Sequence, residues 1–280
     1  MVSIIIVSFN TRELLKSCLE SIYTNLRNFE FEIIVVDNMS RDGTVEMIKK
    51  EFTKARLIQN KTNVGFAKGC NIGGENAKGE YLLFLNSDTQ IKDDTIKNML
   101  VVLEQNKEIG VIGGELQNID DTTSESYGSF YSIKSIISLL FLSFLKKKKV
   151  LSEKSIVDWV SGGFMLIKAP VFKKLNGFDE RFFMYVEDME LCFRVIKLGY
   201  STMFFPQAKA FHQGQGSSDR SFAIVNIFKG ILYFYRKHKT YPEYILIRML
   251  LTIKAISVMI IGILTFNKKL VLTYQKALVF

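Results

Sequence analysis

Short apolar runs alternate with segments of helical periodicity near the start of the chain, and this alternation constrains the fold more than any other feature. Residues 2–7 predict a buried strand, residues 12–25 a helix and residues 31–36 a second strand. Strands joined through a helix in this way pair in parallel and carry helices on their faces. We therefore expect an α/β fold with a mainly parallel central sheet flanked by helices.

The alternation continues with a helix over 44–52, a strand over 56–59, a glycine-rich helix over 65–78 and a strand over 81–85. In open sheets of this kind, ligands bind at the carboxyl ends of the strands. The residues that directly follow the strands are therefore candidate binding residues. They are Asn10, residues 37–40 and residues 86–88.

Composition narrows the class of protein. The 280 residues are 48% hydrophobic, enough for a large core, and the net charge of +9 suits an anionic partner. The basic residues are dispersed or lie beside apolar segments, which favours a membrane surface over nucleic acid. Three cysteines without metal or redox spacing predict buried, reduced thiols, and no secretory signal precedes the first strand, so we expect a cytoplasmic location.

The glycine-rich segment at 63–74 matches neither common nucleotide fingerprint. It lacks the GxGxxG spacing, which disfavours a dinucleotide-dependent dehydrogenase. Gly74 and Gly79 have the separation of a P-loop, but Glu80 and Tyr81 stand where Lys and Ser or Thr are required. Close packing of a helix on the sheet, or close approach to a ligand, explains the glycines instead.

Two aspartates follow predicted strands. Asp37 can accept a hydrogen bond from a nucleotide base, or can be solvated while Ser40 or Asp42 caps the next helix. Asp88 closes the triplet Asn86-Ser87-Asp88; one carboxylate can hold a divalent cation whose other ligands are water and phosphate, although turns favour the same residue types.

An adjacent acidic pair, Glu187 and Asp188, opens a segment whose apolar residues recur at helical spacing. The pair therefore falls at or just before a helix N-terminus, where the helix dipole favours negative charge. Capping of the helix and acid–base chemistry are both compatible with this position.

The middle and the end of the chain contain apolar helical segments with basic ends. Residues 133–145 are too few to span a bilayer, so a membrane- or acceptor-facing amphipathic helix competes with an ordinary packed one. A helix from about residue 222 ends in basic residues 236–239. Residues 245–266 carry Arg248 and Lys254, and their uncharged part of about a dozen residues is shorter than a span requires. We expect an interfacial helix or helical hairpin, with packing on the rest of the protein or on a second subunit as the alternative.

The order of seven motifs along the chain resembles that of family 2 GT-A glycosyltransferases, in particular the rhamnosyltransferase-like branch. The motifs cover roughly residues 1–220; they are the strand before Asn10, VVDNMS around Asp37, NVGFAKGCN, FLNSD, SGGFMLIK, the GFDERFF–EDMELCFR segment and HQGQGS. The resemblance implies a catalytic domain over 1–221, with a nucleotide-sugar half at about 1–115 and an acceptor half at about 116–221. A helical region that binds membrane or forms oligomers would follow at 222–280.

The resemblance also implies roles for individual residues. The nucleotide-binding residues would be Asn10, Asp37, Asn38, Gly65, Asn71, Asn86 and Ser87. The acceptor or donor sugar would contact Trp159, Gly162, Gly163 and Arg194. Asp88 and His212 would hold Mn²⁺ or Mg²⁺, and Asp188 would be the general base with Glu187 beside it. The family's common Asp-x-Asp motif has Asn86 at its first position here. Asparagine can hydrogen-bond the ribose or coordinate a metal ion weakly, so the metal affinity is the property that this departure puts in doubt.

The implied function is that of a metal-dependent inverting transferase. It would move a sugar from dTDP-rhamnose or a UDP-sugar to a hydroxyl of a glycan or lipid-linked acceptor in surface polysaccharide synthesis. We expect it at the inner face of the cell membrane, in peripheral contact with anionic lipid. The alternative is a non-catalytic nucleotide-sugar-binding regulator, which would keep Asp37 and Asp88 but would not need Asp188.

Overall fold

The computed structural model describes residues 1–26, 29–92, 94–118, 122–124, 126–130, 132–133, 136, 151–212 and 219–279. Contacts divide the chain into two compact units, and each is described by itself. The first unit comprises Met1–Ser129, Leu151–Phe183 and Glu187–Ser217; the second comprises Phe130–Val150, Met184–Val186 and Ser218–Phe280.

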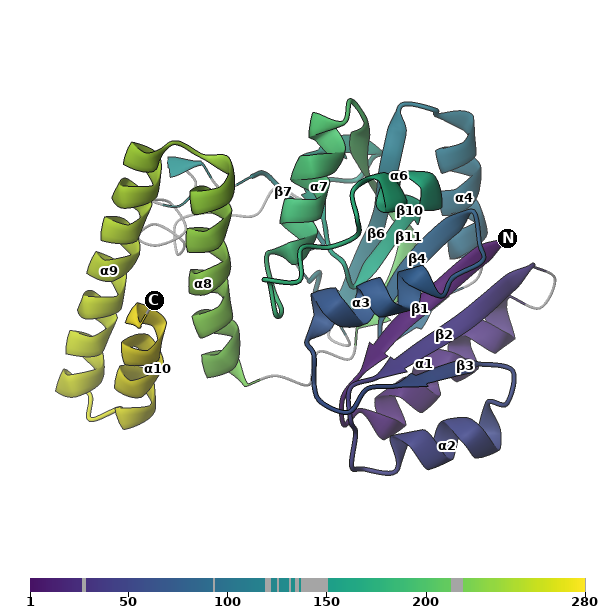
Figure 1. The fold of residues 1–280 in the computed structure, drawn as a ribbon, viewed down its shortest axis with the longest axis horizontal. Helices are drawn as coiled ribbons and strands as arrows, with labels where there is room; N and C mark the ends of the chain where they lie inside the picture. The colour runs from purple at the N-terminus through teal and green to yellow at the C-terminus, as the bar shows by residue number, and fades with distance from the viewer. Residues whose placement is uncertain are drawn as a thin grey trace. The chain divides into compact units, whose positions relative to one another are not determined.

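The first unit is built on a nine-stranded sheet with the order β3-β2-β1-β4-β10-β6-β11-β5, in which β8 also pairs with β11 (Figure 1). One half is parallel; its strands are β1 (Val2–Ser8), β2 (Phe31–Asp37), β3 (Arg56–Gln59) and β4 (Tyr81–Asn86). The other half is mixed; its strands are β5 (Thr89–Ile91), β6 (Ile109–Asn118), β8 (Ser155–Val157), β10 (Phe164–Lys168) and β11 (Ser201–His212). A short ribbon pairs β7 (Tyr127–Gly128) with β9 (Trp159–Val160).

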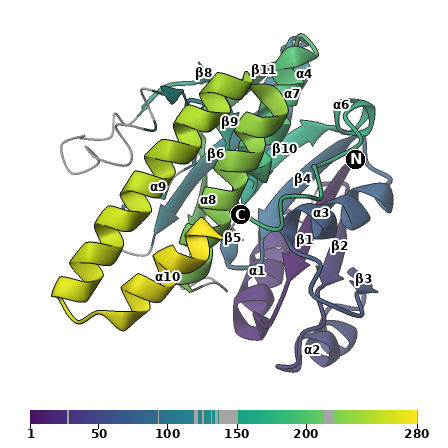
Figure 2. The ribbon, with the colours of Figure 1, turned by 60° about the vertical axis from the view of Figure 1, so that its left-hand side comes forward.

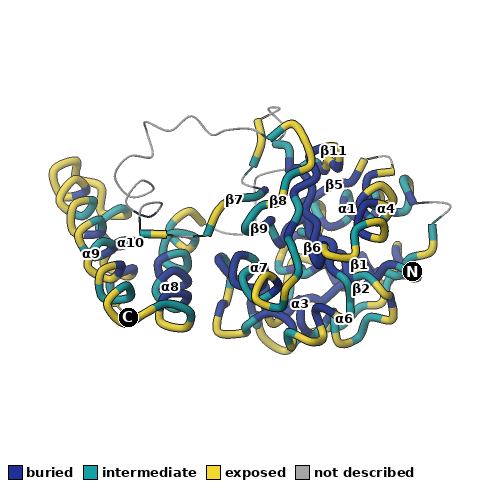
Figure 3. The backbone as a smooth tube through the Cα atoms, turned by 90° about the horizontal axis from the view of Figure 1, so that it is seen from above, coloured by how far each residue is buried: buried dark blue, intermediate teal, exposed yellow. Residues whose placement is uncertain are grey.

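Helices cover both faces of this sheet, so most residues of its central strands are buried, as the dark blue tube in Figure 3 shows. One face packs on α1 (Arg12–Asn25), α2 (Thr44–Glu51) and α4 (Thr95–Gln105). The other face carries α3 (Phe66–Glu75), α6 (Ala169–Lys174) and α7 (Glu187–Lys197). The α/β architecture is confirmed, and the predicted elements up to residue 85 agree with the structure apart from small shifts at their ends. The glycine-rich helix ends at Glu75 rather than residue 78, because Asn76 takes up the C-cap. All three cysteines are buried and free.

Glycines let α3 lie close against β1. A Cβ on Gly69 would be 2.9 Å from the Val7 side chain, and one on Gly73 would collide with Ile5. The glycine-rich segment therefore serves helix–sheet packing.

The second unit contains α8 (Arg220–His238), α9 (Tyr241–Leu264) and α10 (Lys268–Leu278), which lie side by side (Figure 2). A capping box between Thr240 and Glu243 starts α9, and the Asn267 side chain caps α10. The helix predicted from residue 222 is confirmed as α8. The structure gives α9 24 residues, long and apolar enough by length and composition to cross a bilayer, although its uncharged part is shorter; the interfacial placement stays a prediction. Buried helices of soluble proteins meet the same criterion. The apolar segment 133–145 lies almost entirely outside the described residues.

Substituting Gly73→Ala tests the close packing of α3. Alanine in a helix interior normally stabilises a protein by about 1 kcal/mol relative to glycine. Here the added methyl group would collide with Ile5, so we expect the free energy of unfolding to fall by about 1–3 kcal/mol. Urea denaturation followed by circular dichroism measures it. Asn98→Ala on the exposed side of α4 is the control, expected to change it by less than about 0.5 kcal/mol; a stabilised Gly73→Ala protein would refute the packing argument.

Candidate functional site

The register of the parallel strands brings the predicted binding residues to one edge of the sheet. Ser8 is paired with Asp37, and Val7 with Asn86, so β1, β2 and β4 end together. Asn10, Asp37–Asn38 and Asn86–Asp88 therefore gather where a ligand of an open sheet binds.

The loops after β1 and β2 are fastened to each other by three hydrogen bonds. The Asn10 backbone N–H donates to Ser40 Oγ at 2.8 Å, and the Arg41 N–H donates to Asn10 Oδ1 at 2.8 Å. The Arg12 N–H donates to Asp42 Oδ2 at 2.9 Å. Asn10 and Met39 hold left-handed backbone angles, φ +53° and +65°. The structure thus assigns Asn10 to shaping these loops; its contact with a nucleotide stays a prediction.

Asp37 is almost fully buried, with 1% of its surface exposed. One carboxylate oxygen, Oδ2, accepts the Ser40 N–H at 2.9 Å. The other, Oδ1, is buried and has no hydrogen-bond partner among the described residues. Because buried polar atoms are nearly always hydrogen-bonded, Oδ1 marks a place for a ligand's N–H group. A solvated Asp37 does not agree with this burial.

Asn38 supports the turn that leads into α3. Its Nδ2 donates to the Gly65 carbonyl at 3.1 Å and to Asn63 Oδ1 at 3.2 Å, and its Oδ1 accepts from Asn60 at 2.8 Å. Gly65 has φ +86°, and any Cβ there would collide with the Phe183 carbonyl. Only glycine fits this turn, so the sequence requirement at residue 65 is steric.

Asp88 and His212 form a pair at the same edge of the sheet. His212 is the last residue of β11, whose pairing with β5 places it opposite Thr89, and its Nε2 lies 3.2 Å from Asp88 Oδ2. The hydrogen bond to Asp88 raises the pKa of His212 against the opposing effect of burial. Asp88 Oδ1 and His212 Nδ1 are both buried and without a partner in the part of the chain that the structure describes. The Gly-Gln-Gly loop after His212 lies outside that part.

The acidic pair opens α7, as the sequence predicts, and its two members have different surroundings. Asp188 is half-buried; its Oδ2 accepts the Gly162 N–H at 3.0 Å and its Oδ1 the Met189 N–H at 2.8 Å. Glu187 is 4% exposed, and its Oε2 has no partner within the described ranges. Burial, and then the charge of Asp188, raise the pKa of Glu187 well above its ordinary value of 4.5. The two carboxyl groups therefore differ in burial and in hydrogen bonding: Asp188 accepts two backbone N–H groups and is half-exposed, whereas Glu187 is buried.

The diglycine of the SGGF motif connects this acid to the end of β4. Gly162 donates its N–H to Asp188, and the next residue, Gly163, packs so closely on Asn86 that a Cβ would be 2.7 Å from the Asn86 amide. The structure therefore brings together Asp188, Gly162, Gly163 and Asn86.

Trp159 is 30 residues from Ser129 in sequence and donates its indole N–H to the Ser129 carbonyl at 3.2 Å.

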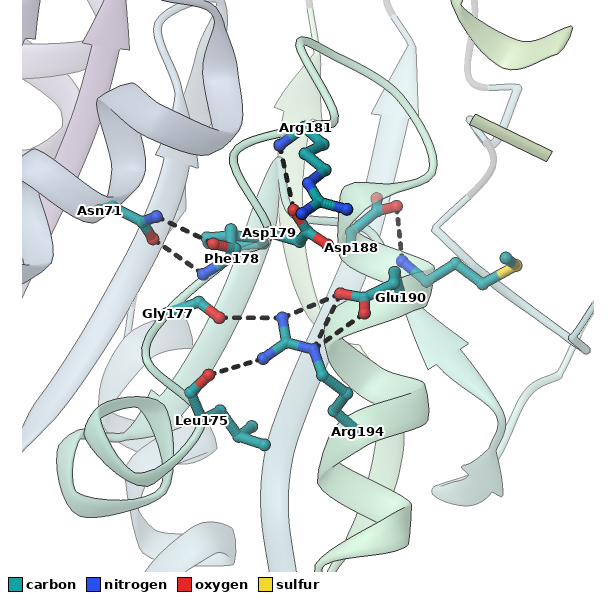
Figure 4. Close-up of polar contacts among 10 residues, drawn as sticks. Asn71, Leu175, Gly177, Phe178, Asp179, Arg181, Asp188, Glu190 and Arg194 are labelled. Atoms are coloured by element: carbon teal, nitrogen blue, oxygen red, sulfur yellow. Dashed lines mark hydrogen bonds and ion pairs between the residues drawn. The ribbon is translucent and has the colours of Figure 1, made fainter. Parts of the chain in front are cut away.

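Arg194 has a bracing role in the structure (Figure 4). Its Nε donates to both carboxylate oxygens of the fully buried Glu190 at 3.0 and 2.9 Å, and its two Nη groups donate to the carbonyls of Leu175 and Gly177 at 2.8 and 2.9 Å. Contact of Arg194 with a sugar stays a prediction. Glu190 was not among the residues predicted for the site, although its spacing of four residues from Arg194 is typical of a helical ion pair.

Asn71 braces the same segment from α3. Its Nδ2 donates to the Phe178 carbonyl at 2.9 Å and its Oδ1 accepts the Phe178 N–H at 2.8 Å, as Figure 4 shows. A side chain occupied in this way fixes a loop, so its predicted place in a nucleotide pocket remains untested.

Two residues with strained backbones directly precede the acidic pair. Tyr185 and Val186 both have φ +71°, a region that costs a non-glycine residue of order 1–3 kcal/mol and is rare for a β-branched one. They belong to the second unit, where Val186 packs on Gly230 of α8: a Cβ on Gly230 would be 2.8 Å from it.

A family model described as glycosyl transferase family 2 matches residues 3–175. The chain belongs to this family. It is 28% identical over 238 residues to the rhamnosyltransferase WbbL of Escherichia coli K12, covering 79% of this chain and 86% of that one. It is 24% identical over 212 residues to an N-acetylglucosaminyl-diphospho-decaprenol L-rhamnosyltransferase of Mycobacterium tuberculosis, covering 67% and 68% of the two chains. The resemblance inferred from the seven motifs is thus confirmed, and the protein is a glycosyltransferase.

Solved structures agree in fold. A mannosyltransferase, PcManGT, of Pyrobaculum calidifontis in complex with GDP-Man and Mn²⁺ superposes with a TM-score of 0.59 at 16% identity, covering 99% of this chain and 73% of that one. Residues 1–349 of S. aureus TarS in complex with UDP-GlcNAc give 0.57 at 14% identity, with 99% and 90% covered. At these identities the likeness establishes the GT-A fold alone.

Asp88 and His212 are the residues at this site that could hold a divalent cation. No group of three His, Cys, Asp or Glu side chains suited to a metal occurs among the residues described. Asp88 and His212 nevertheless present one unpartnered oxygen and one unpartnered nitrogen. Mn²⁺ and Mg²⁺ accept such sparse protein coordination when water and phosphate oxygens complete their shells.

Glu187→Gln should remove a pH dependence of stability. Above pH 4.5 the unfolded chain ionises Glu187 while the folded chain keeps it protonated, so rising pH favours unfolding. As the pH rises above 4.5, the free energy of unfolding of the wild type should fall relative to that of the variant, by at most about 1.4 kcal/mol per pH unit. Urea denaturation at several pH values checks this. Exposed Glu75→Gln should keep the wild-type slope, and parallel curves for wild type and Glu187→Gln would contradict a protonated Glu187.

Proposed function

We propose that the protein transfers a sugar from a nucleoside-diphosphate donor to an acceptor hydroxyl with inversion at the anomeric carbon. The observation that carries this proposal is the link from Asp188 through Gly162 and Gly163 to Asn86, which sets a half-exposed carboxylate beside the nucleotide-binding edge of the sheet. A protein that only bound the donor would not need a carboxylate there.

In the proposed reaction Asp188 acts as the general base. It takes the proton of the acceptor hydroxyl as that oxygen forms a bond to the anomeric carbon. The bond from the same carbon to the diphosphate oxygen breaks, and the leaving nucleoside diphosphate keeps the electron pair. A single displacement from the opposite face inverts the centre, so no carboxylate nucleophile is needed. Glu187 is buried, so an acceptor hydroxyl reaches Asp188 more readily than Glu187.

For the donor we propose a pyrimidine nucleotide, whose base would donate its ring N–H to Asp37. The buried Asp37 Oδ1 can accept the single ring N–H that uracil and thymine share. A divalent cation bound by Asp88 and His212 would neutralise negative charge on the diphosphate. Relatives named as rhamnosyltransferases support rhamnose as the sugar. We propose dTDP-rhamnose as the donor, with a UDP-sugar as the alternative.

For the acceptor, we propose a lipid-linked or growing surface glycan. One relative is named for the transfer of rhamnose to N-acetylglucosaminyl-diphospho-decaprenol, and another, from Myxococcus xanthus, as an O-antigen biosynthesis protein. Both names support surface polysaccharide synthesis.

Asp188→Asn tests the general base. We expect kcat for transfer to fall by about 10²–10⁴-fold while the affinity for the donor nucleotide stays unchanged. Transfer of labelled sugar to a lipid-linked acceptor measures the first quantity, and calorimetric titration with the nucleotide the second. Asp94→Asn, an exposed N-cap substitution on α4, is the matched control with full activity. Undiminished turnover by Asp188→Asn would eliminate Asp188 as the base.

Asp37→Asn tests recognition of the base. The asparagine oxygen must keep accepting the Ser40 N–H, so its NH₂ would face the N–H of the nucleotide base, donor against donor. We expect dTDP or UDP, with Mn²⁺, to raise the melting temperature of the wild type but not of the variant, whereas GDP raises neither. Equal stabilisation of the wild type by GDP would contradict a pyrimidine site.

A further inference from the structure

The positive charge of the chain is concentrated at its C-terminal end. Residues 219–279 contain 10 of the 37 Lys and Arg residues but only 2 of the 28 Asp and Glu residues. Eight of the nine net positive charges therefore lie in the segment that forms α8, α9 and α10. The remaining 218 residues and Phe280 are together almost neutral.

An exposed apolar row runs along α9. Its members recur every three or four residues and are 39–63% exposed; they are Leu246, Met249, Ile253, Ile256, Ile260 and Ile263. Because an α-helix rises 1.5 Å per residue, the row is about 26 Å long. Figure 2 shows α9 with α8 and α10 packed along it, and the residues that it buries there occupy its opposite side; they are Ile247, Leu251, Ala255 and Gly262.

The apolar row continues to the turn between α9 and α10. Phe266 is 93% exposed there, and Lys268 and Lys269 follow directly. Within α9, the spacing of 3.6 residues per turn places Arg248 and Lys254 outside the row, on either side of the buried face. An apolar row with basic residues beside and beyond it is typical of a helix that lies in a membrane interface.

We infer that the apolar row of α9 docks on an anionic lipid surface, with the helix lying in the plane of the headgroups. A second copy of the chain is disfavoured because its matching segment carries the same excess of eight positive charges. A spanning orientation would place Lys254, near the middle of α9, inside the hydrocarbon. An anionic lipid surface would bury the apolar row and attract the positive charges beside it.

Flotation with lipid vesicles tests this inference independently of sugar transfer. The full chain should bind vesicles that contain about one third phosphatidylglycerol at least 10-fold more tightly than pure phosphatidylcholine vesicles, and high salt should weaken the binding. The double variant Ile253→Glu, Ile260→Glu should reduce the binding at least 10-fold. Both positions are about half exposed, so folding should survive, which an unchanged circular dichroism spectrum and nucleotide binding would verify.

The control changes net charge equally but elsewhere: Asn98→Glu with Gln105→Glu on exposed positions of α4 should bind vesicles as the wild type does. Equal vesicle binding by wild type and row variant would overturn the inference. So would a wild-type dimer in sedimentation velocity that the row variant abolishes without any effect on vesicles, because a second copy would then cover the row. Binding that is insensitive to lipid charge and resists carbonate extraction would also overturn it, in favour of a span.

Discussion

A buried ion pair fixes the part of the site where sequence-distant segments meet. Glu190 is fully buried, and the Arg194 guanidinium donates hydrogen bonds to its carboxylate and to the backbone carbonyls of Leu175 and Gly177. Removing either partner would leave a buried charge unpaired, which is among the most costly changes in a protein interior. Because the pair and Asp188 share α7, the direction of that helix, and with it the acid, depends on this contact.

The donor side depends on a different constraint, the parallel register of three strands. Once Ser8 pairs with Asp37 and Val7 with Asn86, the loops that follow must converge. Hydrogen bonds between the loops then hold their polar groups in one arrangement. Preorganised polar groups of this kind bind and catalyse at a lower entropic cost than mobile ones.

Sequence patterns predicted the parallel half of the sheet because each strand there is a continuous apolar run with a helix behind it. The pairing in the mixed half was not predicted, since β10 runs antiparallel to β4 and its residue Phe164 pairs with Leu85, 79 positions earlier in the chain. At the site, Asp37 and Asp88 could be predicted because they stand at the ends of predicted strands. The acidic pair could be predicted because apolar residues at helical spacing follow it. Burial of Glu187, and the carbonyl partners of Arg194, follow only from tertiary packing and have no local signal.

The strained residues before α7 have a practical consequence for dissecting this enzyme. Val186 is buried, and it packs on Gly230, although the chain around it on both sides belongs to the first unit. A protein shortened at residue 218 would therefore expose an apolar side chain two residues from Asp188 and remove what holds a left-handed valine in place. Cutting the polypeptide near residue 221, where the motifs place the end of the catalytic domain, would therefore affect the surroundings of Asp188.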